Sequence, residues 1–248
     1  MASILITGAS SGIGKALASQ LIKEGHEVWG IARNSNLLSQ LSAELKSAKF
    51  KFSICDVAKP EEWKRVKEEM VLKGFLPEIL ILNAGIMSIE PQTNYDVNVG
   101  GVENAWNAFA AELKKSGGTV AVSGSLFSFV QAPFNLSYSE SKLKAYQFLQ
   151  HLDSDATNSK VRFKYFVLGP VNTSKENLSI PFWKSLFIPS AQKTAAHMIN
   201  NLCIAGLINI FPFSSKMLML LNKALPKTLM NVLVTTLKRN LPHQLYRQ

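Results

Sequence analysis

The chain has 248 residues, 47% of them hydrophobic, so it can bury one sizeable core and is expected to form a single domain. Its formal net charge is +10, but the basic residues are diluted among aliphatic ones and match no nucleic-acid-binding motif, so we expect no nucleic-acid partner. Four scattered histidines have no metal-ligand spacing, and no metal site is expected.

The predicted elements alternate strand and helix along the chain. Short apolar runs predict strands at Ile4–Ile6, Val28–Ile31, Lys51–Cys55, Ile79–Leu82, Val120–Val122 and Phe163–Val167. Amphipathic stretches between them, such as Glu61–Leu72 and Val102–Lys115, predict helices. The alternation favours an α/β fold with a doubly wound parallel sheet, in which ligands bind at the carboxyl ends of the strands.

The N-terminal strand and the two cysteines indicate the cellular compartment in which we expect the protein. Because the N-terminus is already a core strand, no cleavable targeting peptide is expected ahead of it. Cys55 and Cys203 both lie in apolar stretches and are predicted to be buried free thiols of a reducing compartment. The cytoplasm is therefore the expected location.

A glycine-rich turn follows the first predicted strand. Residues 7–14 read T-G-A-S-S-G-I-G, and an amphipathic stretch begins after them. Glycines in such a turn let the backbone approach a pyrophosphate, which binds the free N–H groups at the positive end of the helix. The spacing differs from the general G-x-G-x-x-G fingerprint, but strand, turn and helix in this order predict a dinucleotide site in a Rossmann fold.

A second motif, Y-S-E-S-K, carries the chemistry. Tyr138 and Lys142 are four residues apart and lie on one face of a helix. A phenol has a pKa of about 10, and a neighbouring ammonium lowers that pKa toward the working range. Ser125, thirteen residues upstream, can hold a carbonyl oxygen while Tyr138 gives or takes its proton.

Together these motifs resemble the short-chain dehydrogenase/reductase family over roughly the first 175 residues. Further segments match it in order: Asp56-Val57 after the third strand, the N-A-G motif at 83–85, Asn98, and Gly169-Pro170-Val171-Asn172-Thr173 after the strand that ends near Val167. The residues that the resemblance assigns to the dinucleotide are Gly8, Ser10, Ser11, Gly12, Ile13, Gly14, Asp56, Val57, Asn83, Ala84, Gly85, Tyr138, Lys142, Gly169, Val171 and Thr173.

The resemblance implies hydride transfer between a nicotinamide and a carbonyl or secondary alcohol. Tyr138 would be the acid or base, and Lys142 would lower its pKa and hold the nicotinamide ribose. Ser125 would polarise the substrate oxygen. Asn98 would keep a water in a proton relay from Lys142 to solvent; the alternative is that it only kinks or caps the start of a helix.

The end of the second strand predicts which dinucleotide is preferred. NAD-binding relatives carry an acidic residue there, whereas this chain has Ala32 followed by Arg33. No carboxylate repels a 2′-phosphate, and the Arg33 guanidinium can bind one. NADP(H) is therefore expected over NAD(H), with Lys15 as the nearest second basic residue.

Three departures from the family pattern bear on the pocket. The stretch from Asn83 to Asn98 is short, so the first turns of the following helix are expected to be missing. Glu140 stands where a small residue is usual and is expected on an exposed helix face, and Leu168 replaces a common proline.

Four apolar residues before Tyr138 are candidates to line an apolar pocket, namely Phe127, Phe129, Phe134 and Leu136.

The segment 177–248 is not explained by the resemblance. It contains no Asp or Glu but eight Lys and Arg, and it is rich in apolar residues. We expect it to be a helical extension of the same domain as the core at 1–176. On its last predicted helix, one face is formed by Leu229, Val232, Leu233, Thr236, Leu237 and Leu241. Three roles stay open: peripheral contact with an anionic membrane, a pocket lid or subunit-packing surface, and attraction to an anionic substrate or carrier.

Two functions follow from the whole pattern. The leading one is an NADP(H)-dependent oxidoreductase acting on an apolar ketone, aldehyde or secondary alcohol, for which the resemblance implies a homodimer or homotetramer. The alternative is a cofactor-sensing or membrane-tethered binding module with little turnover. The intact set of Ser125, Tyr138 and Lys142 favours the enzyme, because a sensor does not need an activated phenol.

Overall fold

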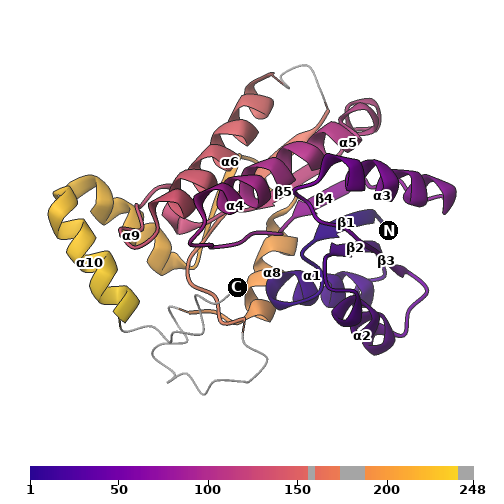
Figure 1. Ribbon diagram of the computed structural model, residues 1–248, viewed down its shortest axis with the longest axis horizontal. Helices are drawn as coiled ribbons and strands as arrows, with labels where there is room; N and C mark the ends of the chain where they lie inside the picture. The colour runs from indigo at the N-terminus through magenta and orange to yellow at the C-terminus, as the bar shows by residue number, and fades with distance from the viewer. Residues whose placement is uncertain (156–159, 174–187, 240–248) are drawn as a thin grey trace.

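The computed structural model describes residues 1–155, 160–173 and 188–239. Within these ranges the strands form one parallel sheet in the order β3-β2-β1-β4-β5-β6-β7 (Figure 1). Its members are β1 (Ser3–Thr7), β2 (Glu27–Ala32), β3 (Phe50–Ile54), β4 (Ile79–Leu82), β5 (Thr119–Ser123), β6 (Arg162–Leu168) and β7 (Ile208–Phe211). The order runs outward in opposite directions from β1 and β4, which leaves a crevice beyond their carboxyl ends. The predicted doubly wound parallel sheet is confirmed.

Helices cover both faces of the sheet. The described helices are α1 (Gly12–Lys23), α2 (Ser35–Leu45), α3 (Pro60–Leu72), α4 (Pro91–Tyr95), α5 (Gly101–Ser116), α6 (Leu136–Asp155), α8 (Ala191–Asn201), α9 (Phe213–Ala224) and α10 (Lys227–Arg239). Helices α1, α2 and α8 bury their apolar sides on one face, and α3, α5 and α6 on the other. A single turn of π-helix, Asp96–Gly100, joins α4 to α5.

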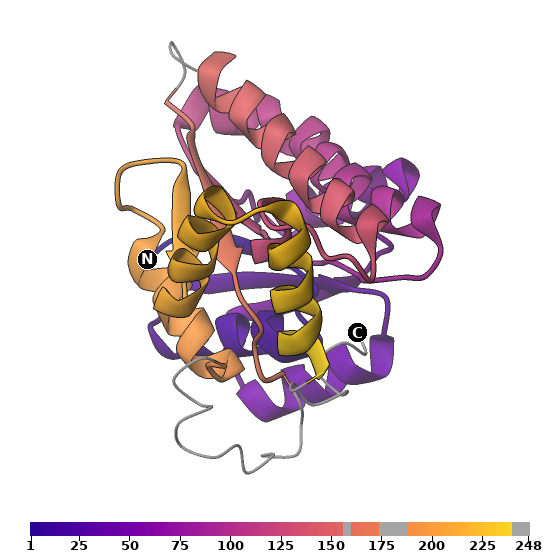
Figure 2. The same cartoon turned by 90° about the vertical axis from the view of Figure 1, so that its left-hand side faces the viewer.

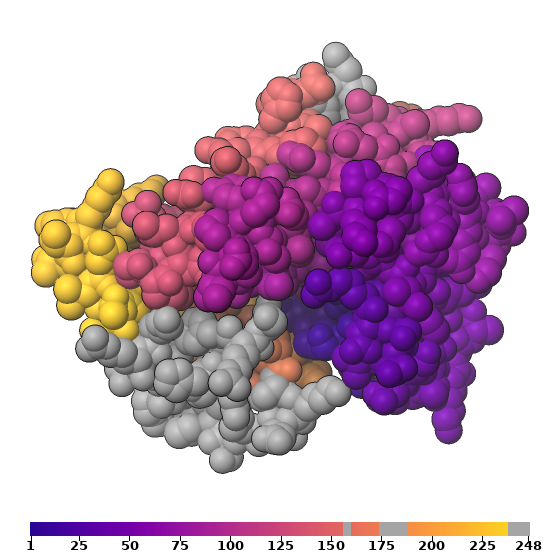
Figure 3. Space-filling view, viewed as in Figure 1, coloured from indigo at the N-terminus to yellow at the C-terminus, as the bar shows by residue number. Residues whose placement is uncertain are grey.

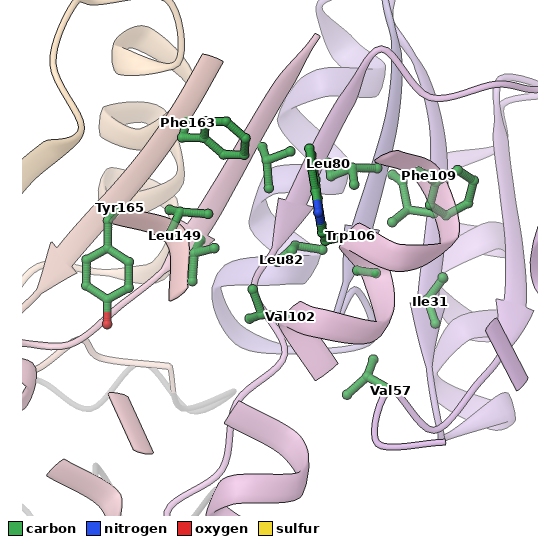
Figure 4. Close-up of a cluster of buried hydrophobic side chains, with 14 of the residues drawn as sticks. Ile31, Val57, Leu80, Leu82, Val102, Trp106, Phe109, Leu149, Phe163 and Tyr165 are labelled. Carbon is green, nitrogen blue, oxygen red and sulfur yellow. The ribbon is translucent and has the colours of Figure 1, made fainter. Parts of the chain in front are cut away.

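Alternate residues of the central strands feed two apolar layers. On β4, Leu80 and Leu82 enter the layer under α5, whereas Ile81 enters the opposite layer. Figure 4 shows the first layer, in which the Trp106 ring lies 5.4 Å from that of Phe163. Burial on both faces explains why these strands read as continuous apolar runs in the sequence.

Two features of the C-terminal third differ from the sequence expectations. The segment expected to be helical supplies, besides α8, α9 and α10, the edge strand β7, which is too short and too exposed to show a strand pattern. Cys203 is exposed, so the prediction that both thiols are buried is wrong for it: its apolar neighbours lie in a surface turn between α8 and β7. Cys55 is buried, and burial raises the pKa of its thiol to about 12, which keeps it protonated and unreactive.

Helices α9 and α10 form a hairpin that follows β7 and stands at one end of the molecule (Figures 1 and 2). On α10 the buried side chains are Met230 and Val234, which join the core layer of α5 and α6. The side of α10 that packs on the core is therefore not the apolar face predicted from the sequence. Three residues of the predicted face, Leu229, Val232 and Leu237, are exposed. A fourth, Leu241, lies outside the described residues. Across the described part of the chain, every helix is too short or too polar to cross a membrane.

Candidate active site

The glycine turn has the geometry of an anion-binding loop. Gly8 and Gly12 have φ angles of 67° and 51°, in the left-handed region that side chains disfavour. A Cβ on Gly14 would collide with the Gly8 carbonyl, so only glycine lets α1 start this close to the turn. Ser11, the N-cap residue, makes no side-chain capping bond, which leaves the first amides of α1 open to an anion.

Asn83 ties together the carboxyl ends of three neighbouring strands. Its Nδ2 donates to the Thr7 carbonyl at 3.2 Å, and its Oδ1 accepts from Ser123 Oγ at 3.1 Å. The next amide, of Ala84, donates to Thr7 Oγ1 at 2.9 Å. These bonds hold the ends of β1, β4 and β5 in one plane below the crevice.

Lys142 reaches this plane from α6. Its Nζ donates to the Ser123 carbonyl at 3.3 Å and lies 6.0 Å from the centre of the Tyr138 ring. A Cβ on Gly85 would lie 2.7 Å from that Nζ, so a side chain there would displace the lysine. Burial lowers the pKa of Lys142 to about 8.

The Tyr138 phenol differs from the sequence expectation in its acidity. Burial raises its pKa, and a hydrogen bond from Ser125 opposes that shift without reversing it. The expected lowering by Lys142 is not seen in this structure, where burial sets the direction of the shift and the opposing effect comes from Ser125. Ser125 Oγ also accepts the Phe127 amide at 3.1 Å, so the serine hydroxyl links the short helical turn after β5 to the Tyr138 phenol.

Asn98 lies within the π-helical turn between α4 and α5 and is buried. Its Oδ1 accepts from the Ile86 amide and its Nδ2 donates to the Ile86 carbonyl, both at 2.9 Å. Nδ2 also donates to Ser141 Oγ at 3.0 Å, next to Lys142 on α6. The residue thus clamps the loop after β4 to α6, and π turns of this kind are frequent at functional sites.

Asn94, one turn before Asn98, was missed by the sequence reasoning. It is fully buried, its Oδ1 accepts the Ser88 amide at 2.7 Å, and its Nδ2 donates to Ser137 Oγ at 2.9 Å. Nothing in its sequence surroundings marks it, because its partners come from a loop and from the start of α6. Exposed Glu140 adds a bond on the outside of the same contact, accepting from Tyr95 Oη at 2.8 Å.

These elements surround a cleft of about 1280 Å³. It is large enough for a dinucleotide and a substrate together. The predicted residues that line it are Gly8, Ser10, Ser11, Gly12, Ile13, Arg33, Asp56, Val57, Asn83, Ala84, Gly85, Ser125, Tyr138, Lys142, Gly169, Val171 and Thr173. Gly14 and Asn98 lie behind the lining and support it. Thr173 reaches the glycine turn, where a Cβ on Gly12 would lie 3.3 Å from its side chain.

The apolar lining differs from the predicted one. Of the four candidates before Tyr138, only Phe127 lines the cleft. Phe129 packs on Tyr146, Phe134 packs behind Phe127, and Leu136 is exposed. The apolar wall comes instead from the C-terminal hairpin, through Phe213, Met217, Leu218, Leu221, Val234 and Leu237. The apolar stretch 217–221 is visible in the sequence, but its spacing does not say which cavity it meets.

The end of β2 presents one basic side chain to the cleft. Ala32 is buried, and the next residue, Arg33, is exposed and lines the cleft. Asn34, also in the lining, accepts the Leu37 amide at 3.0 Å and caps α2. Lys15 is not in the lining and pairs with Glu44 at 2.6 Å, so Arg33 is the cation that the described residues place here.

Comparison with known proteins agrees with this arrangement. A family model described as short chain dehydrogenase matches residues 2–179. The chain belongs to the short-chain dehydrogenase/reductase family of oxidoreductases. Curated relatives include an NADPH-dependent 1-acyldihydroxyacetone phosphate reductase of Saccharomyces cerevisiae, 30% identical over 68% of this chain and 61% of the relative. Another is an NADPH-dependent pterin aldehyde reductase of Arabidopsis thaliana, 36% identical over 43% of this chain and 48% of the relative. The chain thus aligns with about half to two thirds of these two proteins.

Solved structures share the fold. A short-chain dehydrogenase from Burkholderia cenocepacia in complex with NADP superposes with a TM-score of 0.78, at 20% identity, over 94% of this chain and 97% of that one. An alcohol dehydrogenase from Thermococcus sibiricus, complexed with 5-hydroxy-NADP, superposes with a TM-score of 0.75, at 23% identity, over 85% and 96% of the two chains.

Proposed function

We propose that this protein is an NADP(H)-dependent oxidoreductase that interconverts an apolar ketone or aldehyde with the corresponding alcohol. The observation that carries the proposal is a shared cleft: Ser125, Tyr138 and Lys142 line the same cavity as the glycine turn of α1. The cofactor-binding and proton-handling groups therefore face one another.

The residues of the cleft fit a nicotinamide dinucleotide. The open amides of α1 suit the pyrophosphate, and the glycines of the turn let the backbone approach it. Arg33 suits a 2′-phosphate, since no carboxylate stands at the end of β2. The names of the yeast and plant relatives, both NADPH-dependent, support the same preference.

Each polar side chain has a role in this proposal. The bound nicotinamide supplies or accepts the hydride. Tyr138, whose raised pKa keeps it protonated at neutral pH, donates its proton to the substrate oxygen during reduction. Ser125, which hydrogen-bonds to Tyr138, would turn its proton to the substrate oxygen and orient it, and Lys142 holds the ribose as an ammonium. Asn98 fixes the loop beside Lys142, and a water next to it would return the proton from solvent.

The substrate is proposed to be apolar because of the hairpin wall. Met217, Leu218 and Val234 face the cleft and offer no charge to a polar substrate. The yeast relative's name gives a ketone that bears an acyl chain and a phosphate, and the acyl chain agrees with a wall of this kind.

Replacing Tyr138 by Phe tests the proposal. We expect turnover of NADPH with medium-chain ketones to fall about 10²- to 10⁴-fold, since one general acid contributes that much. NADPH affinity, measured by fluorescence titration, should change little. Tyr146→Phe, which removes a hydroxyl two turns along the same helix, is the matched control and should keep full activity.

Two outcomes would contradict the proposal. Wild-type protein that binds neither NADPH nor NADH would remove its basis. Tight binding of NADPH with no turnover of any ketone, aldehyde or alcohol tested, and no difference between wild type and Tyr138→Phe, would favour a cofactor-sensing module instead.

A further inference from the structure

The mouth of the cleft is apolar and open to solvent. Phe213, Met217 and Leu221 follow one another at intervals of four on α9, so they form a stripe on one side of that helix. All three line the cleft, yet they are 73%, 46% and 40% exposed. Leu237 on α10 combines the same two properties. These four side chains are the rim through which a substrate meets the cavity.

The apolar surface continues beyond this rim onto the outside of the hairpin. Leu220, Leu229 and Val232 do not line the cleft and are 54%, 55% and 64% exposed. Exposed apolar side chains that share a short hairpin are a feature of interaction sites. Figures 2 and 3 show that the hairpin stands at one end of the molecule, and in Figure 2 no other described helix or strand lies over its outer side.

Lysines accompany this outer surface. Lys216 and Lys223 lie on the same side of α9 as Leu220, and Lys227 begins α10. All three are exposed. The whole segment 177–248 holds eight basic residues and no acidic one, so no carboxylate from its own segment neutralises them.

The positive charge of these lysines distinguishes between two binding partners for this surface, a second copy of the chain and an anionic membrane. A second copy of the chain that used the same face would bring the same lysines and be repelled. An anionic lipid surface attracts them and accepts the exposed apolar side chains.

We propose that the α9–α10 hairpin docks on an anionic membrane, with Leu220, Leu229 and Val232 in the interface and the apolar rim opening toward the lipid. An apolar substrate dissolved in the bilayer then reaches Tyr138 without crossing water. The second half of this inference rests on the proposed function; the docking itself does not.

Sedimentation with lipid vesicles tests the docking. The probes are vesicles of phosphatidylglycerol and phosphatidylcholine, compared with vesicles of phosphatidylcholine alone. The test variant carries Leu220→Asp, Leu229→Asp and Val232→Asp. The matched control carries Val71→Asp, Leu72→Asp and Ile89→Asp, three exposed apolar residues outside the hairpin and the cleft lining, with the same change of charge.

We expect wild type and control to sediment with the anionic vesicles, less so at high salt, and not with neutral ones. The hairpin variant should lose about tenfold or more of this partitioning. Wild type that stays in solution with anionic vesicles would overturn the proposal, as would equal sedimentation of the hairpin and control variants. A hairpin variant that turns an oligomer into a monomer would assign the face to a second copy instead.

Activity separates this inference from the proposed function. With a short water-soluble ketone and NADPH, the hairpin variant should turn over like wild type; with a long-chain ketone in anionic vesicles it should be selectively slower. If no protein shows turnover, the proposed function fails while sedimentation still decides the docking. Equal rates of wild type and variant on the vesicle-bound ketone would overturn delivery from the bilayer.

Discussion

The two walls of the cleft are built differently. The wall made by the strand ends and α6 is held by bonds between buried or half-buried polar groups, such as those of Asn83, Asn98 and Lys142. The hairpin wall is apolar and half exposed, and packs through Met230 and Val234. Proton transfer needs atoms fixed within hydrogen-bond distance, whereas an apolar substrate needs only complementary surface. In the proposed function, the hydrogen-bonded wall is the rigid wall that performs the chemistry, and the hairpin selects what reaches it.

The largest expected effect contrasts the stability of the two regions. Phe109 is fully buried on α5, so Phe109→Ala should lower the free energy of unfolding by about 3–5 kcal/mol. Val232→Ala on the exposed side of α10 should change it by less than about 0.5 kcal/mol. Urea unfolding followed by circular dichroism measures both. A comparable cost for the two variants would make the hairpin part of the cooperative core and break the comparison.

The next prediction concerns the cofactor end of the rigid wall. Arg33→Ser should weaken NADPH binding about 10- to 100-fold, since hydrogen bonds to charged groups contribute roughly 1.5–3 kcal/mol. NADH binding should be unchanged. Lys15→Ser is the control, because Lys15 pairs with Glu44 away from the cleft. Equal losses for NADPH and NADH would mean that Arg33 does not contact a 2′-phosphate.

A pH dependence follows from the Lys142 pKa of about 8. The ammonium is present below that pH and is lost as the pH rises through it, so NADPH affinity should fall about tenfold between pH 7 and pH 10. Lys142→Met should bind weakly at both pH values, with no such fall. Fluorescence titrations across this range measure it. A fall of the same size in the variant would assign it to another group.

The smallest effect is expected at the hairpin wall. Met217→Ala should raise KM for a long-chain ketone about three- to tenfold, because it removes roughly 1 kcal/mol of apolar contact. KM for a short ketone and the affinity for NADPH should stay the same. Leu220→Ala is the control, because Leu220 lies on the same helix but does not line the cleft. In detergent-free solution it should change neither KM nor the affinity for NADPH. A change in NADPH affinity for Met217→Ala would show that the two walls are not separate.

Much of the rigid wall is readable from the sequence because its signals are local. The strands of the sheet centre are continuous apolar runs. The glycines of the turn are visible in the sequence, and the positive φ angles of Gly8 and Gly12 are the physical reason that glycine stands there. Tyr138 and Lys142 share a helix face by their spacing alone. Asn94 and the direction of the Tyr138 pKa shift were not readable, since both depend on groups distant in the chain.

The hairpin shows both what the sequence determines and what only the tertiary structure determines. Its composition, basic and apolar with no acidic residue, comes from the sequence by itself, as do the parallel sheet, the dinucleotide turn and the Ser125, Tyr138 and Lys142 set. Only the tertiary structure decided that β7 adds an edge strand, that Met230 and Val234 face inward on α10, and that Met217 lines the cleft. An amphipathic pattern records which side chains avoid water, but the partner that buries them is chosen by long-range packing.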